Sequence, residues 1–254
     1  MTFGDSYVDL YDQFYANKDY VKEFENLQIA LERQGKTLKG KKLLEIGSGS
    51  GNFTHLFASI TEVTGVDINE GMIERAKIKF PELSSRLDCL TIKDLINKYD
   101  KDSFDVVVLL FHVFSYLSPN DIILLKELTE KLLISQGLLI FDYWDLNAVD
   151  MNRPSTTLRK INFEGQNFLR LAETQSISRN DKSEEFEVKF DFFLEELEER
   201  KLIFTEKHLM RSYYSRELEL EFNHLECIQD LDILEGEPFQ GKNYGNTKIF
   251  VKHY

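Results

Sequence analysis

The sequence has little of what disulfide-stabilised or membrane-spanning proteins need. Only Cys89 and Cys227 are cysteines among 254 residues, which excludes a disulfide framework and predicts two free thiols in a reducing cytoplasm. The longest apolar runs, such as 106–111, have the length of a strand and cannot span a bilayer. The first fifteen residues carry acids but no basic stretch, so they lack the pattern of a signal peptide. We therefore expect a cytoplasmic protein without a membrane partner.

Positive charge is also scarce. The formal net charge is -13, which argues against a nucleic-acid partner, because such proteins neutralise phosphates with clustered Lys and Arg. The deficit is uneven: residues 151–216 are balanced, and the remainder of the chain carries all of it. The balanced segment is therefore the better place to receive an anionic group. No His, Asp and Glu cluster has the spacing of metal ligands, so no metal is expected.

Strand-like and helical segments alternate over the first 150 residues. The helix expected after residue 117 has Ser118 as its N-cap, Pro119 in its first turn and Gly137 at its end. The apolar runs are continuous, as in parallel strands covered on both faces, and lie at 41–47, 62–68, 86–92, 104–111 and 137–144. This order predicts an α/β fold with a doubly wound, Rossmann-like sheet of seven strands, whose ligands lie beyond the carboxyl ends of the strands.

The pattern changes to period two near Pro154. Polar turns at 164–167 and 179–183 separate about four antiparallel strands. A helix and two final strands, 227–234 and 247–253, then follow. We predict a main domain formed by residues 1–150 and 215–254, with an antiparallel β insertion, 151–214, after the fifth strand.

The stretch "EIGSGSG" (45–51) follows the first predicted strand. Glycines let a backbone approach a ligand closely and present amides at a helix N-terminus, although a tight turn is the simpler alternative. Asn52 stands where a dinucleotide fingerprint has its third glycine, so the spacing does not fit that ligand. Glu45 would face a pyrophosphate badly but suits a ligand ammonium group. The loop therefore favours a small, cationic, adenosine-like cofactor.

Two more acids follow the next two strands. Asp67 ends the second strand, where a carboxylate can accept both hydroxyls of a ribose. Asp94 and Leu95 follow the third strand, and the Asp94 carboxylate could accept the adenine amino group or could be a surface acid. Together with the glycine loop, these residues form a set in strand order.

This set resembles class I S-adenosylmethionine-dependent methyltransferases over about residues 41–145. The stretch "EIGSGSG" resembles their cofactor loop, "GVDINEGMIERA" (65–76) their ribose-binding turn, and "FDVVVLLFHVFSYL" (104–117) the strand and loop under the methionine arm. The resemblance implies S-adenosylmethionine as the cofactor. The cofactor-binding set that it implies is Gly47, Gly49, Asp67, Ile68, Met72, Asp94, Leu95 and Leu110.

Four further stretches resemble the small methyltransferases that modify nucleotide-linked sugars in antibiotic and surface-polysaccharide pathways. They are "LYDQFYANKDY" (10–20), "FHVFSYL" (111–117), "FDYW" (141–144) and "EKHLMRSYYSREL" (206–218). The resemblance implies a small-molecule acceptor and an N-terminal segment folded over the cofactor. Tyr11 would then stand near the transferred methyl group, and Tyr20 near the methionine carboxylate.

The acceptor site is expected around the fourth and fifth strands and the insertion. His112 is the candidate general base, with a purely structural imidazole as the alternative. The histidine that the amino-sugar N-methyltransferases carry falls on Tyr116, which leaves oxygen and nitrogen acceptors open, and His112 favours oxygen. Trp144 would form a wall. His208 or Arg211 could face the cleft; Arg211 suits a phosphate or forms a salt bridge within the insertion.

The sequence thus predicts an S-adenosylmethionine-dependent methyltransferase acting on a hydroxyl or amine of a nucleotide-activated sugar or related small metabolite. An N-methyltransferase of an amino sugar is the near alternative. A dehydrogenase would use the same kind of sheet but a different glycine spacing. A non-catalytic cofactor-binding subunit would keep Gly47 and Asp67 without a productive acceptor pocket. The oligomeric state is not specified by these patterns.

Overall fold

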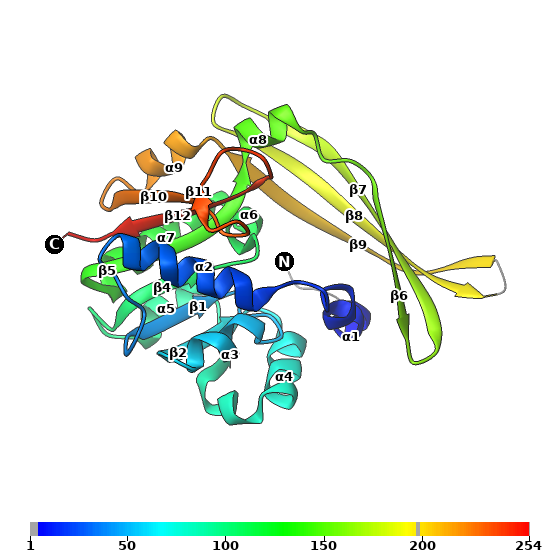
Figure 1. The fold of residues 1–254 in the computed structure, drawn as a ribbon, viewed down its shortest axis with the longest axis horizontal. Coiled ribbons are helices and arrows are strands. Elements are labelled where there is room, and N and C mark those ends of the chain that lie inside the picture. The colour runs from blue at the N-terminus through cyan, green and yellow to red at the C-terminus, as the bar shows by residue number, and fades with distance from the viewer. Residues whose placement is uncertain (1–4, 197–198, 254) are drawn as a thin grey trace.

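A sheet of parallel strands forms the centre of the computed structural model, which describes residues 5–196 and 199–253 (Figure 1). Its parallel part has the order β3-β2-β1-β4-β5. The bounds are β1 Lys42–Ile46, β2 Glu62–Asp67, β3 Leu87–Cys89, β4 Phe104–Leu109 and β5 Leu133–Asp145. All five predicted strands are confirmed. Strand β3 is shorter than expected because Thr91 already caps the next helix.

Two antiparallel strands complete the seven-stranded sheet expected from the sequence. Strand β12 (Gly245–Val251) pairs with β5 on one side and with β10 (Glu226–Asp232) on the other. A two-residue strand, β11 (Glu237–Pro238), pairs with the end of β10. The topology is the Rossmann-like order of a doubly wound α/β fold.

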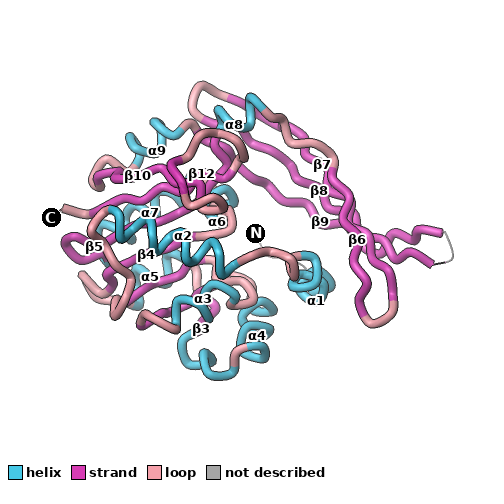
Figure 2. Tube along the Cα trace, viewed as in Figure 1, coloured by secondary structure: helices cyan, strands magenta, loops and turns pink. Residues whose placement is uncertain are grey.

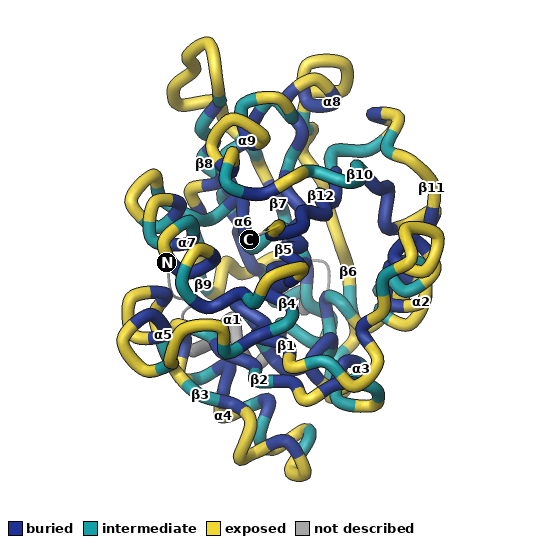
Figure 3. The backbone as a smooth tube through the Cα atoms, turned by 90° about the vertical axis from the view of Figure 1, so that its left-hand side faces the viewer, coloured by how far each residue is buried: buried dark blue, intermediate teal, exposed yellow. Residues whose placement is uncertain are grey.

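Helices cover both faces of this sheet (Figure 1). On one face lie α2 (Tyr20–Arg33) and α3 (Asn52–Ala58), which bury Phe24, Leu27 and Phe57 against it. On the other lie α5 (Ile92–Lys98), α7 (Pro119–Leu132) and α9 (Ser215–Glu221). Buried residues run through the central strands, and exposed ones lie on outer helix turns and loops (Figure 3). No described helix is both long and apolar enough to cross a membrane.

Helix α7 begins as predicted but ends earlier. Ser118 Oγ accepts the N–H of Asp121 at 3.2 Å, and Pro119 stands in the first turn. The expected stop at Gly137 is wrong, because the helix ends at Leu132 and Gly137 lies within β5. A Cβ at Gly137 would be 2.8 Å from the carbonyl oxygen of Ile134, so close backbone contact explains this glycine.

One of the remaining helices lies at the amino terminus, and the others lie between consecutive strands. Asn69 caps α4 by accepting the N–H of Met72 at 3.1 Å. Their bounds are α1 Asp5–Phe14, α4 Glu70–Lys79, the 3₁₀ helix η1 Pro81–Arg86, α6 Val113–Tyr116 and α8 Leu146–Met151.

The insertion forms four long antiparallel strands, as predicted, and Figure 2 shows it as almost continuous strand. The strands are β6 Thr157–Phe163, β7 Gln166–Arg179, β8 Ser183–Glu196 and β9 Glu199–Tyr213. Glu164 and Gly165 form a two-residue turn with φ of 50° and 79°, as hairpins of this kind require. Strand β9 pairs with the last two residues of β5, Trp144 and Asp145, so core and insertion share one sheet.

Candidate active site

A cavity of about 700 Å³ lies beyond the carboxyl ends of the parallel strands. One side is formed by the loops after β1, β2 and β4, and the other by inward-facing residues of the insertion strands. From the core it is lined by Gly47, Gly49, Asp67, Ile68, Met72, Leu90, Thr91, Leu110 and His112; from the insertion and its neighbours by Tyr116, Trp144, Arg159, Arg170, Phe190 and His208. The fold therefore brings most of the predicted site residues to one space.

The glycine loop exposes bare backbone to this cavity. Gly47 has φ of 77°, and a Cβ there would lie 2.5 Å from Val113 Cγ2, so two loops can pack only with glycine at this position. Gly49 has φ of 53° and faces open space, where a Cβ would meet nothing within 4 Å. No Cβ therefore covers the backbone of the loop at Gly49.

Asp67 ties the loop after β1 to the loop after β2. Its Oδ2 accepts the N–H of Gly49 at 2.9 Å, and its Oδ1 accepts the N–H of Asn69 at 2.8 Å. Burial raises the pKa of the Asp67 carboxyl, while the amides of Asn69 and Gly49 act in the opposite direction. A carboxylate has about four acceptor sites, so Asp67 can accept a further donor beside these amides.

The structure corrects the expected place of Glu45. Glu45 belongs to β1, is only 3% exposed and does not line the cavity. Thr54 Oγ1 donates to Glu45 Oε2 at 2.5 Å, and burial raises the pKa of Glu45 to about 8. A buried carboxyl of this kind is mostly protonated at neutral pH. It therefore supports the loop from beneath rather than offering a charge to a ligand ammonium group.

Three other expected cofactor residues also lie outside the cavity. Asp94 Oδ2 accepts the backbone N–H of Thr91 at 2.9 Å and its hydroxyl at 2.6 Å, so this carboxylate completes a capping box at the start of α5. Leu95 is buried in the core under the sheet. Tyr20 lines a neighbouring hollow of about 770 Å³ together with Asp12. At the expected adenine edge, the cavity is lined by Leu90 and Thr91 instead.

His112 lines the cavity and contacts Asp142, an acid that the sequence patterns did not indicate. Phe111 and His112 both have φ of 63°, an uncommon backbone conformation for residues with side chains. Asp142 Oδ1 accepts the backbone N–H of His112 at 2.7 Å. Asp142 Oδ2 lies 3.3 Å from His112 Nδ1, close enough for ion pairing but not aligned as a hydrogen bond. The side chain of His112 is 31% exposed.

Two opposing effects act on the pKa of the His112 imidazole. Burial lowers its pKa, while the nearby carboxylate of Asp142 raises it, and the net direction is downward. It is therefore neutral at pH 7 and can accept a proton, and Asp142 stabilises the cation that results. Gly245 packs against the ring, since a Cβ there would be 3.0 Å from His112 Cε1.

Of the four residues predicted for the acceptor wall, three line the cavity and one does not. Tyr116 and His208 meet across it, with His208 Nδ1 3.4 Å from Tyr116 Oη, and Trp144 lies at the end of β5. Arg211 points elsewhere: its Nη1 donates to the carbonyl of Leu117 at 3.0 Å, and it pairs with Glu185. The salt bridge that the sequence left open is thus what the structure shows.

Helix α1 is fastened across the glycine loop. Asp12 accepts hydrogen bonds from Ser50 Oγ at 2.6 Å and from Arg75 Nε at 2.8 Å, and Lys79 Nζ lies 3.2 Å away. Tyr11, on the same helix, lines the cavity, and burial raises its pKa well above the usual value, so its hydroxyl stays protonated. One acid thereby connects α1, the loop after β1 and α4.

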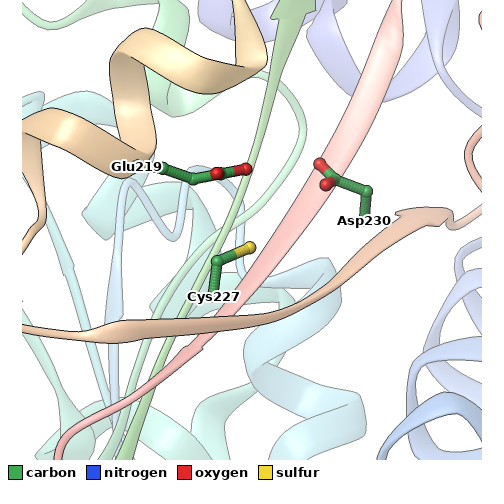
Figure 4. A group of neighbouring side chains, drawn as sticks. All are labelled: Glu219, Cys227 and Asp230. Atoms are coloured by element: carbon green, nitrogen blue, oxygen red, sulfur yellow. The ribbon is translucent and has the colours of Figure 1, made fainter.

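A separate cluster on the far side of β12 brings Glu219, Cys227 and Asp230 together, with ligand atoms within 4.8 Å of one another (Figure 4). The buried ammonium of Lys248 already lies among them, 2.7 Å from Glu219 Oε1 and 3.0 Å from Asp230 Oδ1. Although burial opposes it, the two acids raise the pKa of Lys248. The cluster is therefore an ion-pair network completed by lysine.

Comparison with known proteins identifies what this chain is similar to in sequence and in fold. Residues 43–133 match a family model described as a methyltransferase domain. A protein of Haemophilus influenzae described as uncharacterized is 28% identical over 198 residues, 76% of this chain and 68% of that protein. An S-adenosylmethionine-dependent methyltransferase from Clostridium acetobutylicum is 18% identical, with a TM-score of 0.73 over 98% of this chain and 99% of its own. The sugar N-methyltransferase KedS8 from Streptoalloteichus is 16% identical, with a TM-score of 0.71 over 96% and 93%.

At these identities the two solved structures establish the fold, and the family match covers the part of the chain that carries the glycine loop, Asp67 and His112. Residues 43–133 therefore carry a methyltransferase domain, and the whole chain has the fold of S-adenosylmethionine-dependent methyltransferases.

Proposed function

We propose that the enzyme methylates a hydroxyl or amine of a nucleotide-activated sugar or related small metabolite, as in surface-polysaccharide biosynthesis. The observation that carries this proposal is the single cavity in which loops of the core and strands of the insertion meet around His112. In this proposal the methyltransferase domain is formed by 1–150 and 215–254, and the insertion, 151–214, forms the acceptor wall.

The core half of the cavity fits an adenosine-bearing sulfonium compound. Bare backbone at Gly47 and Gly49 permits close approach, and the lone pairs left on Asp67 suit the ribose hydroxyls. Ile68 and Met72 would flank the adenine, with Leu110 under the methionine arm. We assign the adenine edge to Leu90 and Thr91, because Asp94 and Leu95 are engaged elsewhere. When bound, the cofactor supplies an activated methyl group.

The half of the cavity that faces the insertion would position the acceptor and accept its proton. Holding an acceptor in line at near-attack distance can remove on the order of 7–11 kcal/mol of barrier in the best cases. His112, neutral and backed by Asp142, would take the proton from an acceptor hydroxyl. An amine that arrives neutral needs no base. Tyr11, Tyr116 and Trp144 would form the walls around the reacting group.

The likeness in fold to KedS8, a sugar N-methyltransferase, supports a sugar acceptor and keeps nitrogen as an alternative to oxygen. The base at His112 is the observation that favours oxygen, since neutral amines do not require one.

The test is incubation with S-adenosylmethionine and pooled sugar nucleotides, followed by mass spectrometry for the gain of one methyl group. Pools of amino-sugar and of deoxy- or hydroxy-sugar nucleotides separate nitrogen from oxygen acceptors. His112→Ala serves as the catalytic variant, with His55→Ala, an exposed histidine on α3, as the matched control. Full affinity for S-adenosylhomocysteine without methyl transfer to any pool would instead indicate a non-catalytic cofactor-binding subunit.

A further inference from the structure

Two arginines stand directly opposite each other on neighbouring strands of the insertion. Arg159 on β6 is the register partner of Arg170 on β7, and both line the cavity. Residues directly opposite on antiparallel strands share one face, and like charges in this arrangement destabilise a sheet. Since this pair does not stabilise the sheet, another interaction is needed to explain two adjacent cations here.

Arg170 is a buried cation surrounded by aromatic rings. It is 4% exposed, and its guanidinium lies 5.2 Å from the ring centre of Phe14 and 5.0 Å from that of Phe190. Its Nη1 donates to Tyr15 Oη at 3.0 Å, while its buried Nε has no hydrogen-bond partner. The guanidinium of Arg159 also lies near Tyr15, 5.7 Å from its ring centre. Its Nη1 donates to the carbonyl of Phe14 at 3.3 Å.

Within the described part of the chain, neither guanidinium has a carboxylate partner. The other arginines of the insertion strands differ, since Arg179 pairs with Asp150 and Glu184, Arg200 with Glu195, and Arg211 with Glu185. An arginine cannot lose its proton in a protein, and a buried charge without a counter-ion costs free energy. A ligand that brings negative charge into the cavity would remove this cost.

We infer that Arg170, with Arg159 beside it, anchors a phosphate group of the acceptor. This inference rests on the proposed function and specifies how its acceptor is recognised. A guanidinium fork matches phosphate oxygens in a bidentate manner, and two adjacent guanidinium groups provide two charges for a diphosphate. Arg170, rather than the paired Arg211, is thus the phosphate-binding arginine of the insertion.

The surroundings of the pair leave room for the rest of a nucleotide. Arg159 also lines a second hollow of about 720 Å³, which shares Tyr15, His112 and Tyr244 with the cavity. A diphosphate held between the two arginines can therefore direct its sugar toward His112 and its nucleoside into this second hollow. Arg170 lies on the insertion wall, opposite the glycine loop, which assigns it to the acceptor rather than to the cofactor carboxylate.

The first measurement is the affinity of UDP, dTDP and inorganic pyrophosphate by calorimetry with S-adenosylhomocysteine present. Arg170→Met should weaken the tightest of these probes at least tenfold, and Arg159→Met should weaken it less because that side chain is exposed. Lys207→Met removes the same charge from an exposed position on β9 and should leave the affinity unchanged. Failure of the wild type to bind any of the probes, or equal affinity in Arg170→Met, overturns the inference.

A second measurement separates the two possible sources of negative charge. S-adenosylhomocysteine has a carboxylate, whereas methylthioadenosine has none, and Arg170→Met should bind both as the wild type does. A loss confined to S-adenosylhomocysteine would assign Arg170 to the cofactor and overturn the inference. Arg170→Lys keeps the charge without the fork and should retain part of the diphosphate affinity.

Thermal unfolding provides a readout that a structural role would not produce. Without ligand, Arg170→Met should melt at least as high as the wild type, because it removes an unpaired buried charge, and the rise in Tm with diphosphate should be lost. A lower Tm together with an unchanged diphosphate-dependent rise contradicts the inference. Arg170-dependent diphosphate binding without methylation of any sugar nucleotide would support the anchor and refute the proposed acceptor. Methylation of a sugar nucleotide by Arg170→Met at the wild-type rate and KM would support the acceptor class and refute the anchor.

Discussion

Asp142 holds His112 at two points, accepting its backbone N–H at 2.7 Å through Oδ1 and placing Oδ2 3.3 Å from its imidazole Nδ1. The first contact secures a backbone with positive φ at Phe111 and His112, which few residues with side chains adopt. The second places negative charge beside a ring that must become positive when it accepts a proton. One buried acid on β5 thereby fixes both the position and the basicity of the imidazole.

We expect His112→Ala to lower kcat for a hydroxyl acceptor by about 10²–10⁴-fold, the usual contribution of a general base. The affinity for S-adenosylhomocysteine should change little, since the variant leaves the glycine loop and Asp67 intact. Steady-state kinetics and calorimetry measure the two effects, with His55→Ala as the control. Unchanged turnover would remove the role of base from His112.

Asp142→Asn should displace the acidic limb of the kcat/KM profile to lower pH. The carboxylate raises the pKa of His112 against the lowering effect of burial, so removing its charge lets that pKa fall further. The limb reports protonation of the free enzyme's base. The measurement is the kcat/KM profile of the wild type and of Asp142→Asn between pH 4 and 9. An acidic limb that stayed in place or moved to higher pH would contradict the effect assigned to Asp142.

Glu45→Gln should stabilise the protein increasingly as pH rises. The ordinary pKa of this carboxyl is 4.5, and burial raises it to about 8, so between these values the folded state keeps a proton that the unfolded state has lost. Stability from this group is complete below 4.5 and is lost as pH rises through 8; glutamine does not titrate. Urea unfolding should show equal stabilities at pH 4 and a gain on the order of a few kcal/mol at pH 9.

The matched control for that comparison is Glu62→Gln, which replaces an exposed glutamate at the start of the neighbouring strand β2. It should show no gain at either pH. A Glu45→Gln variant that loses affinity for S-adenosylhomocysteine without losing stability would return Glu45 to the cofactor site.

Asp12→Ala should weaken cofactor affinity by about tenfold, which is close to 1.4 kcal/mol. The substitution removes the carboxylate that joins α1 to Ser50 of the glycine loop and to Arg75 of α4. Asp88→Ala, which breaks an exposed ion pair with Lys98, is the control and should have no effect. Calorimetry with S-adenosylhomocysteine distinguishes the two, and equal affinities would show that α1 does not contribute to binding.

A chelator should leave both Tm and methyl transfer unchanged. The lysine ammonium of Lys248 already satisfies Glu219 and Asp230, so these acids have no vacancy for a cation. Lys248→Met should instead destabilise the protein by several kcal/mol, of the order found when one partner of a buried pair is removed. A fall in Tm on adding EDTA to the wild type would contradict this explanation of the cluster.

Sequence patterns predicted the strands well because buried parallel strands require continuous apolar runs whatever the ligand. They did not reveal which way individual acids point. Asp94 was expected at the adenine, yet Thr91 three residues before it is a capping-box signal that explains its carboxylate without a ligand. Glu45 gave no such signal, since its partner Thr54 lies on another element.

In the acceptor wall, too, features set within one strand could be predicted from the sequence, and features set by the pairing of strands could not. Alternation along β7 places Arg170 on the same face as Phe168 and Ala172, so a buried cation there could have been found from the sequence. The pairing of Arg211 with Glu185 depends on the register between β8 and β9, which periodicity alone does not set. Likewise, Asp142 and His112 meet only because β4 and β5 are neighbours.

Along one edge of β5 the neighbouring strand changes from β4, which pairs as far as Phe141, to β9, which pairs with Trp144 and Asp145, while β12 lies along the other edge. Core and insertion are therefore joined by backbone hydrogen bonds at the point where the acceptor is expected, and the wall cannot swing open as a separate flap. The amino-terminal helix is held instead by side chains, among them Asp12, so we expect reactant and product to exchange on its side of the cavity.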